Sequence, residues 1–297
     1  MAQAAKTTAG DARLVRLASI VSVAVALALV LVKAWVWLLS GSLSVLASLA
    51  DSMLDGAASL INLLAIRYSQ KSADSDHPFG HGKAEYLAGL GQSLFIAGSA
   101  LFILVQALRR IVEPHPLDVT GLSVGVMIFA VLLTAALVLF QQKVVARTGS
   151  MAIKADSLHY SADLFTNLGT VLALALAAAG WAVLDPLIAV VIALVVLYNA
   201  WRIGHDSTQF LLDCKLPPEL EARIFAIAMA NRGVEGVHDI KTRRSGQTEI
   251  IQLHLEMKGS MPLAESHRIA KEVENDIRKT VPAADIIIHQ DPIAGRE

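Results

Sequence analysis

The sequence has very little cysteine and few charged residues. Cys214 is the single cysteine among 297 residues, so the chain cannot form an intramolecular disulfide or a multi-thiolate metal site. Any metal ligands must come from aspartate, glutamate and histidine. Only 17% of the residues are charged, 55% are hydrophobic, and the mean hydropathy is +0.55. These values exclude an ordinary soluble domain and indicate an integral protein of the lipid bilayer.

Two further absences narrow the function. The chain has 25 basic and 26 acidic residues and a net charge of -1, so nothing in its charge indicates a nucleic-acid partner. It has no His-Glu-x-x-His motif, and the apolar segments that hold the candidate ligands contain no glutamate. An intramembrane metalloprotease would need such a glutamate as its general base. We therefore expect a protein that is not an enzyme.

Six apolar segments are long enough to cross a bilayer, which takes about 20 residues of helix. They are approximately Leu14–Leu39, Leu43–Tyr68, Tyr86–Val112, Leu117–Val145, Met151–Ala179 and Leu184–Phe210. The polar tail, residues 1–13, precedes a first segment that we interpret as a span and not as a cleaved signal peptide. Residues 14–210 are thus predicted to form a six-helix transmembrane domain.

Basic residues orient these spans. They lie before the first span and in the connections after the second and fourth: Lys6, Arg13, Arg16, Arg67, Lys71, Lys83, Lys143, Arg147 and Lys154. On the other side, the first and third connections, near Gly41 and Gly180, carry no basic residue. The second connection on that side is an exception, because Arg109 and Arg110 lie there. Because basic connections stay in the cytoplasm, we expect both termini to be cytoplasmic.

The composition changes after Phe210, and residues 211–297 read as a separate α/β domain. Lys215-Leu-Pro-Pro218 resembles a linker that ends at a helix start. The pattern that follows predicts a helix, two strands, a helix and a strand. The last four elements are Val237–Arg243, Glu249–Met257, Leu263–Lys279 and Asp285–His289, with a hairpin turn through Arg244-Ser-Gly-Gln247.

Two pairs of ionisable residues lie inside apolar segments, Asp51 with Asp55 and His159 with Asp163. Residues four apart share one helix face. Each carboxylate at the centre of a span costs roughly 2.5 to 3.5 kcal/mol, which favours a tetrahedral metal site over polar packing between helices. Oxygen and imidazole ligands suit Zn²⁺, Fe²⁺, Mn²⁺ or Co²⁺. Asp156 shares the face of His159 and Asp163 and is an alternative ligand.

The same residues predict coupling to protons. Three crowded carboxylates do not all ionise cheaply without a cation, and a histidine must be neutral to ligate. Metal and protons therefore compete for the site. A transporter that alternates between a neutral cytosol and a more acidic exterior would exchange one for the other.

Two other groups of candidate ligands occur outside the spans. Asp74, His77 and His81 lie in the polar loop before Lys83, where Asp76 is an alternative to Asp74 and a plain solvated loop is the competing interpretation. The C-terminal domain holds His238, His254, His267, His289 and Asp291. His289 and Asp291 alternate along a strand and so share one face. Single histidines usually serve the surface or the core, so the prediction depends on their convergence, in which case Asp291 would bridge two metal ions.

These motifs together resemble the cation diffusion facilitator family over nearly the whole chain. The resemblance rests on the two intramembrane pairs, on the loop from His77 to Glu85, and on the ending Ile286-Ile-Ile-His-Gln-Asp-Pro292. Pro78 after His77 departs from the family pattern. The resemblance implies a homodimer in the bacterial inner membrane with a metallochaperone-like cytoplasmic domain.

The resemblance also implies roles for residues. Asp51, Asp55, His159 and Asp163 would form the transport site, and this argues against Asp156. Asp74, His77 and His81 would form a membrane-surface site, and His238, His254, His267, His289 and Asp291 a binuclear cytoplasmic site. Lys83 and Asp213 match a charge interlock of the dimer, and Leu158 matches a hydrophobic gate.

The expected function is a proton-coupled antiporter that exports divalent metal from cytoplasm to periplasm by alternating access. Zn²⁺ is the expected cargo, with Cd²⁺ and Fe²⁺ as further substrates, and Zn²⁺ would also bind the cytoplasmic domain as a structural or regulatory ion. The alternative is a membrane-anchored metal sensor that transports nothing. An anchor, however, does not need buried aspartate pairs.

Overall fold

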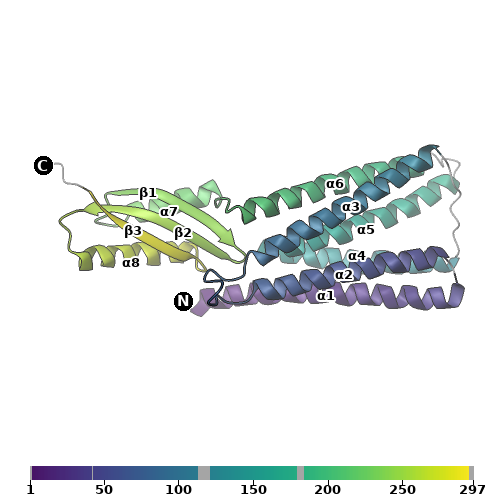
Figure 1. Cartoon of the computed structure of the whole chain (residues 1–297), viewed down its shortest axis with the longest axis horizontal. Helices are drawn as coiled ribbons and strands as arrows, with labels where there is room; N and C mark the ends of the chain where they lie inside the picture. Colours follow the sequence, from purple (N-terminus) through teal and green to yellow (C-terminus); the bar gives the residue numbers. More distant parts are fainter. Residues whose placement is uncertain (1, 42, 113–120, 179–183, 294–297) are drawn as a thin grey trace.

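A computed structural model describes residues 2–41, 43–112, 121–178 and 184–293. Six long helices form one body, and a small α/β domain sits at one end of it (Figure 1). The helices are α1 (Ala2–Ser40), α2 (Leu43–Ser69), α3 (Ala84–Val112), α4 (Gly121–Thr148), α5 (Met151–Ala178) and α6 (Leu184–Leu211). The predicted helical membrane domain is confirmed; the predicted ends at Leu117 and Ala179 lie outside the described residues.

Two details differ from the sequence-based expectation. The segment expected to be a tail is helical from Ala2, because α1 continues from the first span without a break. Among the described residues, five helices are long and apolar enough to span a bilayer, and α5 is not one of them. Its described part carries Lys154, Asp156 and Asp163, which lower its hydropathy.

Small residues let the helices pack closely. α3 runs along α6, and α1 runs along α2 (Figure 1). A Cβ atom on Gly89 of α3 would lie 2.8 Å from Oγ of Ser207, and one on Gly204 of α6 would lie 2.9 Å from Oγ of Ser93. Close backbone approach at small residues is how helices associate in lipid, where no hydrophobic force drives them together. α5 contacts α3, α4 and α6 and so lies at the centre.

The C-terminal domain has the predicted order of elements. It comprises α7 (Pro218–Met229), β1 (Gly236–Ser245), β2 (Thr248–Lys258), α8 (Leu263–Thr280) and β3 (Asp285–Ile293). β2 is central, pairs antiparallel with β1 and pairs parallel with β3. α8 supplies the crossover that a parallel pair of strands requires.

Within the described residues, the helices of this domain cover one face of the sheet. Ile251, Leu253 and Leu255 of β2 are fully buried in a core with Val273 and Ile277 of α8. Because side chains alternate along a strand, the residues between them point to the opposite face. That opposite face carries the polar residues of β2, His254 among them.

The hairpin turn of the C-terminal domain contacts the loop between α2 and α3. A Cβ atom on Gly82 would lie 2.6 Å from the carbonyl oxygen of Ser245. Tyr86 of α3 lies with its hydroxyl 3.5 Å from the carbonyl oxygen of Gly246, to which it donates. The loop that holds the surface candidate ligands is thus fixed between the two domains.

Candidate functional site

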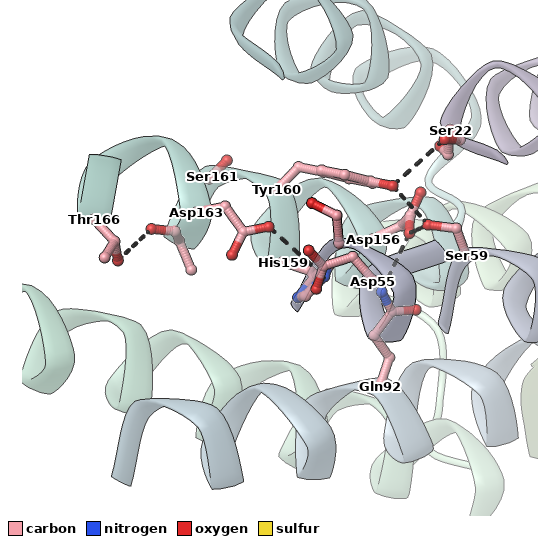
Figure 2. Close-up of polar contacts among 12 residues, drawn as sticks. Ser22, Asp55, Ser59, Gln92, Asp156, His159, Tyr160, Ser161, Asp163 and Thr166 are labelled. Carbon is pink, nitrogen blue, oxygen red and sulfur yellow. Dashed lines mark hydrogen bonds and ion pairs between the residues drawn. The ribbon is translucent and has the colours of Figure 1, made fainter. Parts of the chain in front are cut away.

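α2 and α5 bring three of the four intramembrane candidates together. Nε2 of His159 lies 3.0 Å from Oδ1 of Asp55 and 3.8 Å from Oδ2 of Asp163. One potential ligand atom from each of the three residues lies within 4.8 Å of the other two. Figure 2 shows the side chains of Asp55, His159 and Asp163 gathered in one place. The side chain of His159 is 5% exposed, whereas that of Asp163 is 37% exposed, so the group is buried on one side and open on the other.

Asp51 is not part of this close group. It lies one helical turn before Asp55 on α2, and it is exposed. Nζ of Lys33, on α1, donates to Oγ of Ser52 next to it. Asp51 as a fourth ligand stays a prediction. The sequence reasoning did not consider Lys33, although a lysine in the middle of an apolar segment was a visible signal.

Asp156, the alternative ligand, is occupied by hydrogen bonds. It is fully buried and accepts from Nε2 of Gln141 at 2.7 Å, Nε2 of Gln92 at 3.2 Å and Oγ of Ser59 at 3.4 Å. The hydroxyl of Tyr160 lies 2.8 Å from the same Ser59 oxygen (Figure 2). The donors come from α2, α3 and α4. Asp156 therefore joins helices together, and it lies outside the group of close ligand atoms.

Leu158, the predicted gate, packs against two clusters of buried apolar side chains. One cluster includes Tyr86 and Ile203, and the other includes Ile96 and Val196. Both clusters join α3 to α6. Leu158 thus places an apolar side chain directly beside the predicted metal ligand His159, and its role as a gate stays a prediction.

The loop candidates form a second close group. Oδ1 of Asp74 lies 3.2 Å from Nδ1 of His77, and its Oδ2 lies 3.4 Å from Nε2 of His81. The backbone N–H groups of His77 and Asp76 also donate to Asp74. The bond from the His77 backbone is the main reason why the pKa of Asp74 is held below its ordinary value. Asp74 and not Asp76 supplies the carboxylate of this group.

Three histidines of the C-terminal domain align across the sheet. His238 of β1 pairs with His254 of β2, which pairs with His289 of β3. All three rings reach Asp291. Its Oδ2 lies 2.8 Å from Nδ1 of His254 and 3.3 Å from Nε2 of His238, and its Oδ1 lies 3.1 Å from Nε2 of His289. Each carboxylate oxygen of Asp291 thus faces different histidines: Oδ2 faces those of β1 and β2, and Oδ1 faces the one of β3. A ligand that bridges two metal ions needs its two oxygens arranged in this way.

His267 is not brought to this group within one chain. It is exposed on α8, whose apolar side packs on the other face of the sheet. Two acidic residues that the sequence reasoning missed do reach the histidines. Oε1 of Glu256 lies 3.0 Å from Nδ1 of His238, and Oδ2 of Asp239 lies 3.7 Å from Nε2 of His254. Glu256 could have been predicted from the sequence, because it lies two residues after His254 and therefore shares its face of the strand.

Lys83 and Asp213 form an ion pair within one chain. Nζ of Lys83 lies 2.8 Å from Oδ1 of Asp213, and Nη1 of Arg243 lies 3.2 Å from the same oxygen. Partial burial opposes ionisation of Asp213. Its contacts with the two cations outweigh this effect and hold the pKa of Asp213 below its ordinary value. A role of this pair at a dimer interface stays a prediction.

Comparison with known proteins agrees with this architecture. Residues 19–212 match the cation efflux transmembrane domain, and residues 216–293 match the cytoplasmic domain of cation efflux proteins. The cation-efflux pump FieF of Klebsiella pneumoniae is 48% identical over 280 residues, which cover 94% of this chain and 93% of that protein. The cation-efflux pump FieF of Pectobacterium atrosepticum is 49% identical over 283 residues, which cover 95% and 94%.

Among solved structures, the metal-bound C-terminal domain of the CzcD transporter from Thermotoga maritima is similar to a smaller part. It is 24% identical, covers 27% of this chain and 93% of that chain, and has a TM-score of 0.25. The family matches together span both domains, and the relatives are efflux pumps. The chain therefore belongs to the cation diffusion facilitator family, and it is a cation-efflux transporter and not an enzyme.

Proposed function

We propose that this transporter is a proton-coupled antiporter that exports divalent metal, Zn²⁺ above all and also Cd²⁺ and Fe²⁺, from the cytoplasm to the periplasm. The supporting observation is the meeting of His159 with Asp55 and Asp163 between two membrane helices. Imidazole and carboxylate form a mixed nitrogen and oxygen set, which suits these ions better than Ca²⁺ or Mg²⁺. Asp51 would complete the tetrahedron through a small rotation of α2.

The contacts of His159 support the exchange of metal for protons. Its Nε2 faces carboxylate oxygens of Asp55 and Asp163, and ionised carboxylates only accept hydrogen bonds. Nε2 therefore donates an N–H in this arrangement. A metal ion needs the lone pair of the same nitrogen, so coordination there displaces that proton; a doubly protonated ring then releases one proton, whereas a neutral ring only moves it to Nδ1.

The layers along α5 support alternating access to a fixed site. α5 begins at Met151, close to the C-terminal domain (Figure 1). The buried bonds of Asp156 and the packed Leu158 lie between that end and His159. Asp163 lies one turn further away and is partly exposed. With the C-terminal domain in the cytoplasm, this arrangement closes the site toward the cytoplasm, and separation of the layers would open it.

The other two groups would bind metal without carrying it across. In the cytoplasmic domain, Asp291 would bridge two ions held by the three aligned histidines, and in a homodimer His267 would complete the second site. Bound Zn²⁺ would then tighten the dimer. Asp74, His77 and His81 would form a weaker site at the membrane surface, and both termini would lie in the cytoplasm of an inner-membrane protein.

The test is metal flux into proteoliposomes with a pH indicator inside. Wild type, Asp163→Asn and the matched control Asp285→Asn, an exposed carboxylate on β3, receive Zn²⁺, Cd²⁺, Fe²⁺ and Mn²⁺ separately. We expect Zn²⁺ entry with loss of lumenal protons in the wild type and the control, and neither in Asp163→Asn. Flux without proton movement would overturn the coupling. Tight binding without any flux would indicate the alternative, a membrane-anchored sensor.

A further inference from the structure

Lys33 is an isolated charge in the first membrane helix. Between Arg16 and Asp51 the sequence contains no other charged residue. Lys33 falls inside the apolar span Gly10–Leu39. A lysine there costs roughly 2.5 to 3.5 kcal/mol on insertion scales, and such residues are retained where they face a partner or a pathway for ions. Neither the ligand groups nor the helix packing described above accounts for it.

The structure fixes the ammonium group against α2. Nζ of Lys33 donates to Oγ of Ser52 at 2.6 Å and to the backbone carbonyl oxygen of Ser48 at 3.1 Å. Ser52 is buried and lies directly after Asp51 in sequence. A lysine that only avoids lipid extends its side chain toward the membrane surface. Lys33 instead reaches across to the turn of α2 that carries the acidic residues.

From this position the charge of Lys33 acts on the three carboxylates of the intramembrane group. It interacts electrostatically with Asp55, Asp163 and Asp51. Its hydrogen bonds, however, go to the neutral oxygens of Ser48 and Ser52. The carboxylate oxygens that would ligate a metal ion are therefore not needed to hold the ammonium in place.

We propose that Lys33 is a resident counter-cation of the transport site, held by Ser48 and Ser52 so that the charge of the site matches a divalent cation. This inference rests on the proposed function. Three ionised carboxylates, one ammonium and a neutral His159 leave two negative charges. A divalent ion brings that total to zero, whereas a monovalent ion leaves a net charge in a low-dielectric region, where it is costly.

The ammonium also limits how tightly the ion is held. Repulsion between the fixed cation and the bound metal weakens binding and favours release, which a transporter needs in each cycle. Removal of the lysine charge should therefore tighten metal binding and slow turnover. A merely structural defect has the opposite effect on affinity, because a distorted site binds metal more weakly.

The test is calorimetric titration of the full-length detergent-solubilised protein with Zn²⁺. All proteins carry Asp74→Ala and Asp291→Ala, which remove the carboxylate shared by each of the other two ligand groups. Lys33→Met keeps the length of the side chain without its charge, and we expect its Zn²⁺ Kd to fall about tenfold or more. Lys33→Arg restores the charge and should reverse most of that change. In proteoliposomes, Lys33→Met should lower the maximal rate of Zn²⁺ flux.

An Asp163→Asn variant in the same background distinguishes failure of the counter-cation role of Lys33 from failure of the proposed transport site. If Asp163→Asn abolishes binding and Lys33→Met leaves the Kd unchanged or raises it, the counter-cation role is wrong and the transport site stands. If Asp163→Asn binds Zn²⁺ as tightly as the background protein, the transport site is wrong and the role of Lys33 falls with it. Tightening in Lys33→Met with reversal in Lys33→Arg supports both.

Discussion

Oδ1 of Asp213 lies 2.8 Å from Nζ of Lys83, so an ion pair joins the linker after α6 to the loop before α3 within a single chain. Arg243 of β1 reaches the same carboxylate. The membrane domain, the linker and the C-terminal domain thus meet at one acidic side chain. Because this junction contacts both domains, a movement of one domain would be transmitted to the other through it.

Asp213→Asn should loosen this junction in a pH-dependent manner. The folded-state pKa of Asp213 is lowered, so its stabilisation is present above the ordinary aspartate pKa of about 3.9 and is lost as the pH falls through the lower folded-state value. Because the pair is partly exposed, we expect at most about 1 kcal/mol. Thermal unfolding at pH 7 and at pH 3 measures this. The difference between wild type and variant should shrink at the lower pH, and an equal difference at both values would contradict the prediction.

Asp163→Ala should abolish Zn²⁺ transport and leave the protein folded. Asp163 is a ligand candidate whose side chain is partly exposed, so little packing is lost on truncation. We expect flux to fall at least a hundredfold while light scattering still reports the same mass as for the wild type. Retained flux would exclude Asp163 from the transport site.

Asp156→Ala should destabilise the membrane domain without removing a metal ligand. The substitution removes the carboxylate that accepts hydrogen bonds from the buried amides of Gln92 and Gln141, and each buried donor left unsatisfied costs about 1 to 3 kcal/mol. The thermal unfolding temperature should therefore be much lower than that of the wild type. Zn²⁺ titration of the folded fraction should keep the wild-type number of ions. Loss of one ion per chain would show instead that Asp156 is a ligand.

Asp291→Ala should remove metal from the cytoplasmic domain, and His238→Ala should only weaken its binding. The carboxylate of Asp291 contacts three histidines, whereas His238 is one of three rings. We expect atomic absorption of purified protein to show two fewer ions per chain for Asp291→Ala. Zn²⁺ flux should persist in both variants. Complete loss of flux would place the cytoplasmic group on the transport path.

Gly82→Ala should separate the C-terminal domain from the loop that holds Asp74. A Cβ atom at Gly82 would lie 2.6 Å from the Ser245 backbone, which is closer than packing allows. Gly91→Ala is the matched control, because no atom lies within 4 Å of its added Cβ. Hydrogen exchange at residues 245–248 should accelerate in Gly82→Ala and not in the control. Unchanged exchange would mean that the contact contributes nothing to docking.

Much of the candidate site was predictable because it depends on local spacing. The pair Asp51 and Asp55, and the pair His159 and Asp163, must each share a helix face at 3.6 residues per turn. The alternation of His289 and Asp291 likewise fixes them on one face of a strand. Length and hydropathy predicted the membrane helices, because the bilayer imposes both.

Local spacing could not predict which neighbour meets each face. Asp156 and Asp163 lie on the same side of α5, and it is the donors arriving from α2, α3 and α4 that make Asp156 a hydrogen-bond acceptor. The depth at which α1 packs against α2 decides that Lys33 reaches Ser52. Such contacts depend on the rotation and depth of separate helices, which no short stretch of sequence determines.

The sequence by itself therefore determined the membrane class, the order of elements in both domains and the residue types of three groups of candidate ligands. The tertiary structure alone decided that Asp55, His159 and Asp163 meet closely while Asp51 and His267 stand apart, and that Lys83 pairs with Asp213 in one chain. The physical reason is that helix and strand periods are short-range properties of the backbone. The meeting of side chains from distant segments is set by how whole helices and sheets pack.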